Sequence, residues 1–249
     1  MARCSLASGR CGRLGTPCAS GRCLARTVGR LHERRWRDKL GLLFVEGEDA
    51  LEAATAEPVE VLRAGENVEP ALLAEVASAG HPPRVIAVFR RGDLPAWEPR
   101  PATLALWRLA DPGNLGTLIR TADAFGAAVA LSAGCADPTS PKAMRASAGS
   151  LWRVPLGTWD DLPATRVALV AHGGEPLGSV ALPEPVAFLL GAEREGLPAD
   201  VERCADAHIP IGGAESLNVA AAGAIALYEL SRRSDARRST PPMPAAPAA

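Results

Sequence analysis

Aromatic residues are scarce in this chain, at 4% of 249 residues, although hydrophobic residues make up 47%. A core of ordinary size therefore has to be built mainly from Ala, Val and Leu. No apolar run approaches the ~18 residues of a membrane span, which predicts a soluble protein. Because no apolar stretch follows the first residues, we expect no secretory signal and predict a cytoplasmic location.

Several cofactor and metal signatures are also missing. The chain has no GxGxxG and no GxxxxGK[ST], which disfavours a dinucleotide fold or a phosphate loop. The six cysteines form no CxxC pair, so a zinc knuckle is not expected, and the four histidines have no metal or triad spacing. We therefore predict no metal, and reduced thiols at Cys135 and Cys204.

Charge is distributed unevenly along the chain. Residues 1–39 carry ten basic and two acidic residues, a net charge of +8, whereas the whole chain has a net charge of -1. This asymmetry is consistent with an anionic partner that meets the basic end. A solvated, disordered leader explains the same pattern equally well, and both interpretations stay open.

The chain divides into five predicted segments. Hydrophobic patterning becomes regular at residue 28, and residues 93–101 hold three prolines and one tryptophan, which is typical of a linker. We predict a disordered basic leader over 1–27, a small substrate-binding domain over 28–92, a linker over 93–102, a larger domain over 103–235 and a disordered tail over 236–249.

Both domains are predicted to alternate strands with helices, which indicates α/β modules with largely parallel sheets. In the first domain we expect helices at 28–39, 48–56 and 69–79 and strands at 42–45, 59–62 and 84–88. In the second we expect strands at 103–107, 128–131, 167–171, 186–190 and 207–211, and helices at 114–125, 140–147 and 217–232. A doubly wound sheet places its ligand crevice at the carboxyl ends of its strands.

Three polar loop-to-helix junctions fall at such strand ends. They are Asp111-Pro-Gly-Asn-Leu-Gly-Thr-Leu-Ile-Arg120, Leu189-Leu-Gly-Ala-Glu-Arg-Glu-Gly196 and Ile209-Pro-Ile-Gly-Gly-Ala-Glu-Ser-Leu-Asn-Val219. Polar side chains at apolar junctions need a ligand or a backbone partner, so three together predict one composite site. Taken singly, the glycines could simply form turns, Glu193 could be a helix N-terminal acid, and Arg120 a surface residue, a phosphate clamp or a catalytic group.

The motifs Asn114-x-Gly-x-x-x-Arg120, Leu190-Gly-Ala-Glu193-x-x-Gly and Ile209-Pro-Ile with Ser216-Leu-Asn218 resemble those of a known family. In order and spacing they are similar to the three motifs of the SpoU (TrmH-like) RNA 2'-O-ribose methyltransferases of the SPOUT superfamily. Ser140-Pro-Lys-x-x-Arg-Ala-Ser also resembles that family. Residues 28–90 resemble its N-terminal RNA-binding domain more weakly. The loop between Ile209 and Ser216 departs from the family pattern because it is one residue shorter.

The resemblance implies a SPOUT-type fold, an α/β parallel-sheet catalytic domain with a deep trefoil knot and a smaller N-terminal α/β RNA-binding domain. It implies S-adenosylmethionine as cofactor and a homodimer formed through the C-terminal domain. The implied catalytic residues are Arg120, Asn114, Glu193, Ser216 and Asn218, and the implied cofactor-binding residues are Leu190, Gly191, Ile209, Ile211 and Leu217. Arg120 would deprotonate or electrostatically activate the ribose hydroxyl.

The expected function is methyl transfer to a ribose 2'-hydroxyl of RNA, with ribosomal RNA favoured by the accessory N-terminal domain. Three alternatives stay open: a tRNA 2'-O-methyltransferase, a non-catalytic RNA-binding or assembly factor on the same scaffold, and a base-methylating SPOUT enzyme. The identity of the modified nucleotide leaves no simple motif, because RNA is recognised largely by shape.

Overall fold

The computed structural model describes residues 22–78 and 81–239. Their contacts form two compact units that interleave along the chain. The first unit contains the residues as far as Ala96, together with Asp111–Arg120 and Ala136–Arg153. The second contains Trp97–Ala110, Thr121–Cys135 and the residues from Val154 onward. The contiguous division predicted at residues 93–102 stays a prediction.

The first unit has a three-stranded sheet with the order β1-β3-β2. Its strands are β1 (Leu42–Glu46), β2 (Glu60–Arg63) and β3 (Val85–Arg90). β3 is antiparallel to both neighbours, so the prediction of a largely parallel sheet is wrong for this unit. The helical crossover does make β1 and β2 parallel to each other, but β3 inserts between them, and alternation along the sequence cannot reveal which strands become neighbours.

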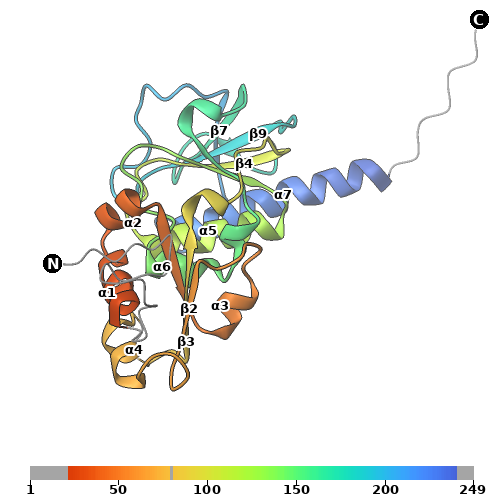
Figure 1. Cartoon of the computed structure of the whole chain (residues 1–249). Coiled ribbons are helices and arrows are strands. Elements are labelled where there is room, and N and C mark those ends of the chain that lie inside the picture. The colour runs from red at the N-terminus through yellow and green to blue at the C-terminus, as the bar shows by residue number, and fades with distance from the viewer. Residues whose placement is uncertain (1–21, 79–80, 240–249) are drawn as a thin grey trace, which may run out of the picture. The chain divides into compact units, whose positions relative to one another are not determined.

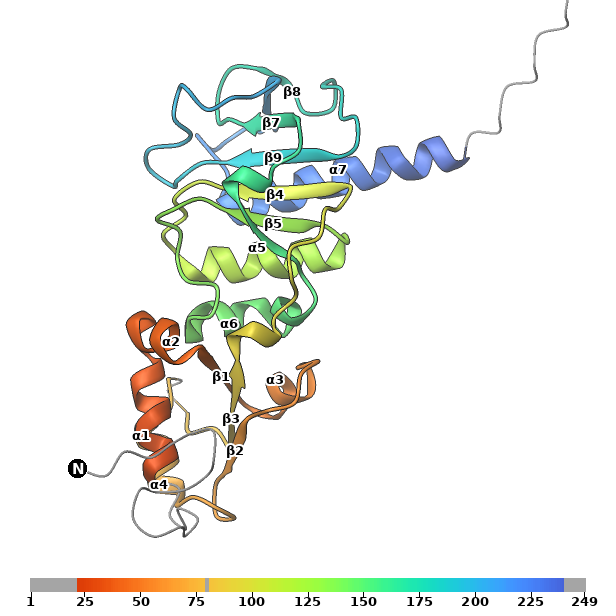
Figure 2. The same cartoon turned by 45° about the horizontal axis from the view of Figure 1, so that its top comes forward.

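Four helices accompany this sheet: α1 (Arg22–Leu31), α2 (Arg34–Leu40), α3 (Glu48–Glu52) and α4 (Pro70–Val76). α1 and α4 lie side by side on one face of the sheet, and α3 lies on the other (Figures 1 and 2). α1 begins at Arg22, inside the predicted disordered leader, because Ala25, Val28 and Leu31 recur at helical spacing and are fully buried. The rest of that leader lies outside the described residues.

The single basic helix predicted over residues 28–39 is in fact two helices. The chain leaves helical geometry at Glu33, whose φ and ψ are -93° and 131°. The Arg37 guanidinium accounts for this break, because it donates to the carbonyls of Leu31 (2.6 Å) and His32 (2.9 Å), which end α1. α2 then ends at Gly41, which adopts a left-handed φ of 64°.

Two further helices contribute to the first unit. α5 (Pro112–Ala124) begins in it and ends in the second unit, and α6 (Pro141–Ser147) lies wholly within it. Ser140 caps α6 by accepting a hydrogen bond from the Ala143 amide. α5 and α6 pack closely at Gly116, where an added Cβ would lie 2.4 Å from the Ala143 carbonyl oxygen.

The second unit is built on a seven-stranded sheet with the order β6-β5-β4-β9-β7-β10-β8, in which every pairing is parallel. Its strands are β4 (Ala102–Leu106), β5 (Ala128–Leu131), β6 (Leu156–Thr158), β7 (Thr165–Leu169), β8 (Glu175–Pro176), β9 (Val186–Leu190) and β10 (Ala205–His208). Figure 2 shows β7, β9, β4 and β5 side by side. The parallel α/β fold class predicted from the sequence is confirmed here, although β6 and β8 were not predicted.

The two central strands of this sheet, β4 and β9, are buried along their whole length, as parallel strands covered on both faces must be. Small residues dominate one core cluster on this sheet, which contains Ala105, Ala130, Ala168 and Ala187 with Leu189 and Leu162. The core is therefore poor in aromatics, as the composition predicts. The chain continues into α7 (Val219–Ser239), a helix longer than the predicted one. The trefoil knot implied by the resemblance stays a prediction.

Candidate active site

A pocket of about 600 Å³ opens at the carboxyl ends of β7, β9 and β10 in the second unit. Parallel sheets bind their ligands at this edge, because the loops that follow the strands converge there. Three loops and the start of α7 form its walls. The lining consists of residues 168–171, 190–194, 196 and 197, Arg203, Ile209, Ile211, residues 216–219 and Ala222.

Eight of the ten predicted site residues line this single pocket. They are Leu190, Gly191, Glu193, Ile209, Ile211, Ser216, Leu217 and Asn218. The second and third junctions therefore meet, and the shortened loop before Ser216 still delivers Ile209 and Ile211 to the wall. The roles of these residues in binding and catalysis stay predictions.

The loop after β9 is a tight hairpin. Ala192 and Gly196 exchange two backbone hydrogen bonds, of 3.1 and 2.9 Å, and Gly196 has a φ of +66°. An added Cβ at Gly191 would lie 2.3 Å from the Gly196 carbonyl carbon, so the hairpin folds back directly over Gly191. Glycine at 191 is thus required by close backbone packing, and Glu193 and Arg194 at the tip of the hairpin reach the pocket.

Asn218 joins the pocket to the closing helix. Its side-chain oxygen accepts hydrogen bonds from the amides of Ala220 (2.8 Å) and Ala221 (3.3 Å), which makes it the N-cap of α7. The polar junction that looked awkward in the sequence therefore has a local structural use at this residue. Ser216 and Glu193 are exposed at the pocket.

The sequence reasoning missed Arg203 and the end of β7. Arg203 lies within 3.4 Å of the carbonyls of Pro198, Ala199 and Val201 and forms a 2.5 Å ion pair with Asp206, so it holds the loop between β9 and β10 in shape. The end of β7 lines the pocket because β7 lies between β9 and β10 in the sheet. That strand order could have identified it, but order is not readable from a single sequence.

The other two predicted residues, Asn114 and Arg120, lie on α5 in the first unit. Asp111 caps this helix by accepting a hydrogen bond from the Asn114 amide (2.9 Å), and its carboxylate also binds Lys142 (2.7 Å). The Lys142 ammonium and the Asn114 amide lower the pKa of Asp111. Arg120 is exposed, and no carboxylate in the described part of the chain pairs with it. Its approach to the pocket stays a prediction.

Neither a metal-binding cluster nor a membrane-spanning helix is found among the described residues. Within residues 22–78 and 81–239, no group of three or more His, Cys, Asp or Glu side chains is arranged to hold a metal ion. No helix in the same ranges combines the length and the apolar character needed to cross a membrane. Cys135 is buried and Cys204 exposed, and both are free thiols; the other cysteine side chains lie outside the described set.

Comparison with known proteins identifies the family. A model described as the SpoU rRNA Methylase family matches residues 101–228, which is more than half of the chain. The chain belongs to this family. All ten predicted site residues fall within the matched range. This SpoU methylase is therefore an RNA methyltransferase, as the motifs had indicated.

Relatives of this SpoU methylase match it over most of their length. It is 33% identical to a protein of Synechocystis sp. named as an uncharacterized tRNA/rRNA methyltransferase, over 88% of this chain and 93% of that protein. It is 32% identical to the 23S rRNA (guanosine(2553)-2'-O)-methyltransferase RlmP of Bacillus subtilis, over 81% of this chain and 93% of that protein. An AdoMet-bound rRNA methyltransferase from Sinorhizobium meliloti has a similar structure, with a TM-score of 0.73 at 28% identity, over 84% of this chain and 94% of the other.

Proposed function

We propose that this SpoU methylase transfers a methyl group from S-adenosylmethionine to a ribose 2'-hydroxyl of ribosomal RNA in the cytoplasm. The pocket at the ends of β7, β9 and β10 carries the proposal, because it gathers the predicted cofactor residues and three predicted catalytic residues. Relatives support the chemistry: RlmP is named as a 23S rRNA 2'-O-methyltransferase, and the Sinorhizobium meliloti structure contains AdoMet.

The residues of the pocket fit a nucleoside cofactor. Its volume of about 600 Å³ lies within the roughly 300–1,000 Å³ usual for small-molecule sites. Leu190, Ile209, Ile211 and Leu217 supply apolar contacts for a flat ring. The hairpin over Gly191 offers main-chain groups at close range, and these are suited to the polar edge of an adenine. S-adenosylmethionine supplies an electrophilic methyl group on its sulfonium when it is bound.

The protein's own residues then have to activate and align the ribose hydroxyl. A ribose hydroxyl ionises far above neutral pH, so it needs a cation beside the developing oxyanion. Arg120 is exposed, so in our proposal its guanidinium stabilises that negative charge electrostatically while the hydroxyl proton passes to solvent water. Asn114, Glu193 and Ser216 position the ribose and Arg120, and alignment of oxygen and methyl supplies a large share of the rate. Asn218 contributes by fixing the start of α7 at the pocket wall.

We further propose that the enzyme is a homodimer that associates through α7, and that its catalytic fold contains the trefoil knot. Ile225 and Tyr228 are large apolar side chains on α7 that are 37% and 60% exposed. Such side chains support an interface that covers them. Sedimentation of the full chain should give twice the monomer mass.

The decisive experiment measures transfer of labelled methyl to RNA from a strain that lacks the gene, with rRNA and tRNA fractions assayed separately. We expect label at a ribose of rRNA. Label in tRNA alone would show that the substrate is tRNA rather than rRNA. Label on a base would show that the methyl acceptor is a base rather than a ribose hydroxyl. A folded protein that binds S-adenosylmethionine in calorimetry but labels neither fraction would refute the enzymatic proposal and favour a non-catalytic RNA-binding factor.

Arg120→Ala tests the catalytic assignment. Loss of the charge at the oxyanion should slow transfer by about 100-fold or more, while the calorimetric affinity for S-adenosylmethionine stays near wild type. Arg100→Ala, which removes a cation paired with Glu98, is the matched control and should retain activity. Equal activity of the Arg120 variant and the wild type would exclude the proposed role.

A further inference from the structure

Three cations surround one tryptophan on the α1–α2 pair. Arg30 on α1 and Arg35 on α2 lie with their guanidinium carbons 4.9 and 5.6 Å from the centre of the Trp36 ring. The Lys39 ammonium lies 5.2 Å from it. Trp36, Arg30, Arg35 and Lys39 together are called the Trp36 cluster below. All three distances are within the range of cation–π attraction.

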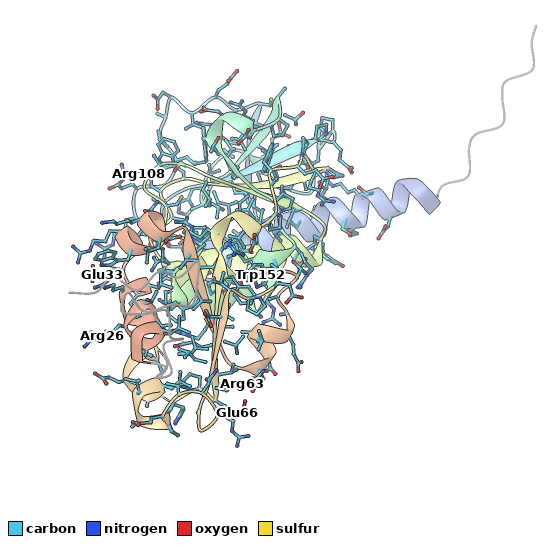
Figure 3. All side chains as sticks on the ribbon, in the orientation of Figure 1. Arg26, Glu33, Arg63, Glu66, Arg108 and Trp152 are labelled. Carbon is cyan, nitrogen blue, oxygen red and sulfur yellow. The ribbon has the colours of Figure 1, made fainter. Side chains whose placement is uncertain are left out.

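The charges of this cluster are exposed and largely unneutralised. Arg30, Arg35 and Lys39 are all exposed, and only Arg35 has a carboxylate partner within the described ranges, Glu33 at 2.6 Å. Arg26 extends the positive surface by one turn of α1, and both Arg26 and Glu33 point away from the three-stranded sheet (Figure 3). The surface is therefore strongly positive and open to solvent.

Such an arrangement favours the binding of an external anion. Three like charges around one ring lie well inside the Debye length of about 10 Å at 0.1 M salt, so they repel one another. Exposed cation–π contacts are individually weak, so they orient these side chains more than they stabilise the fold. An anion with several charges at phosphate spacing would neutralise the three cations and so reduce their mutual repulsion.

The backbone beneath the cluster is anchored by a buried arginine. Arg37, two residues from Lys39, is buried and binds the Asp137 carboxylate through Nε (3.0 Å) and Nη2 (2.7 Å). The same guanidinium holds the last carbonyls of α1, so α1 and α2 keep a fixed angle. The cations on the two helices are thus held in place before any partner arrives, which reduces the entropy cost of binding.

We infer that the Trp36 cluster is an RNA-docking surface that grips phosphates of the substrate RNA; the identity of the RNA rests on the proposed function. Arg30, Arg35 and Lys39 contact phosphate oxygens, and the Trp36 ring keeps the three cations together. A lipid surface is a poorer fit, because the apolar face of α1, with Val28 and Leu31, is already buried in the protein core.

The test compares a charge-neutral variant, Arg30→Gln/Arg35→Gln/Lys39→Gln, with a control that removes three cations elsewhere. The control is Arg63→Gln/Arg100→Gln/Arg232→Gln, in which every lost cation was paired with a carboxylate. Filter binding to rRNA from the deletion strain is measured across a series of salt concentrations. Circular dichroism confirms that both variants are folded.

Loss of three phosphate contacts should make the negative slope of log K against log salt less steep by about 2. A change of 2 in this slope means that the variant loses about 100-fold more affinity at 0.1 M salt than at 1 M salt. In methyl transfer, KM for RNA should rise while kcat at saturating RNA and calorimetric cofactor affinity stay unchanged. Trp36→Leu should weaken binding only about two- to fivefold and leave the slope unchanged, because the charges remain.

An unchanged salt slope in the cluster variant would overturn the inference, and so would an equal loss in the control. Lost binding to phosphatidylglycerol vesicles with intact rRNA binding would overturn it in favour of a membrane partner. If the wild type labels no RNA at all, the proposed function fails, but the filter-binding comparison still decides whether the cluster docks RNA.

Discussion

The buried ion pair between Arg37 and Asp137 should control the stability of the first unit. Their side chains are only 3% and 5% exposed, and they are 100 residues apart in sequence. An exposed ion pair contributes about 0–1 kcal/mol, whereas removal of one member of a buried pair costs about 3–5 kcal/mol, because the other charge is left desolvated. We therefore expect Arg37→Ala and Asp137→Ala each to lose about 3–5 kcal/mol of unfolding free energy.

The local bonds explain why this pair is satisfied in the wild type. The Asp137 carboxylate also accepts bonds from the Thr139 amide (2.9 Å) and hydroxyl (2.7 Å). Burial alone would raise the pKa of Asp137, but the Thr139 and Arg37 hydrogen bonds outweigh it and lower that pKa. Its stabilising contribution should therefore be complete above about pH 4, the unfolded-state range, and be lost as the pH falls through the lower folded-state pKa.

Urea unfolding at pH 7, followed by far-ultraviolet circular dichroism, measures the loss. Arg63→Ala is the matched control, because it breaks the partly exposed pair with Glu48 and should cost no more than about 1 kcal/mol. The double variant Arg37→Met/Asp137→Leu should recover much of the loss, since no unpaired charge remains. Single variants within about 1 kcal/mol of wild type would refute the assignment of a desolvated, structural pair.

Three other substitutions follow from close contacts. Gly116→Ala puts a methyl group 2.4 Å from a backbone oxygen of α6 and should cost about 1–3 kcal/mol of stability in thermal unfolding. The control Gly92→Ala, whose added Cβ has no atom within 4 Å, should leave stability unchanged. Equal losses in the two variants would contradict the packing argument. Gly191→Ala places a Cβ 2.3 Å from the backbone of its own hairpin and should weaken S-adenosylmethionine binding about tenfold or more in calorimetry. The control Gly178→Ala, whose added Cβ has no atom within 4 Å, should bind the cofactor as the wild type does. Asn218→Ala removes the cap of α7 and should cost about 1 kcal/mol in thermal unfolding; Asn218→Asp keeps an acceptor and should be close to wild type, so a similar loss in both would argue against capping.

The second unit was predictable because its signals are local. A parallel strand buried on both faces is a short apolar run, and Val186–Leu190 and Ala128–Leu131 were predicted with correct bounds. The polar junctions that begin at Leu189 and Ile209 predicted most of the pocket wall for the same reason. Strand order is a non-local property, so the sequence predicted neither the antiparallel sheet of the first unit nor the part that the end of β7 plays in the pocket.

Arg37 shows the same limit at the level of one side chain. Within the basic segment around it, nothing distinguishes Arg37 from its exposed neighbours. Its partner Asp137 lies in a distant loop, and only the folded chain brings the two charges together. The break between α1 and α2 depends on the same guanidinium, through its bonds to the Leu31 and His32 carbonyls, so it was equally invisible in the sequence.

The contact between Phe89 and Trp152 has a consequence for folding during synthesis on the ribosome. Phe89 on β3 is fully buried and packs against Trp152 with a centroid distance of 4.8 Å, and Thr55 bonds to the Trp152 carbonyl. A nascent chain that has reached only Ala96 lacks Trp152 and must leave this aromatic face bare. At ~5–20 residues/s, synthesis up to Arg153 takes on the order of seconds more. During that interval the three-stranded sheet lacks the residues that cover Phe89, and a fragment that ends at Ala96 should aggregate.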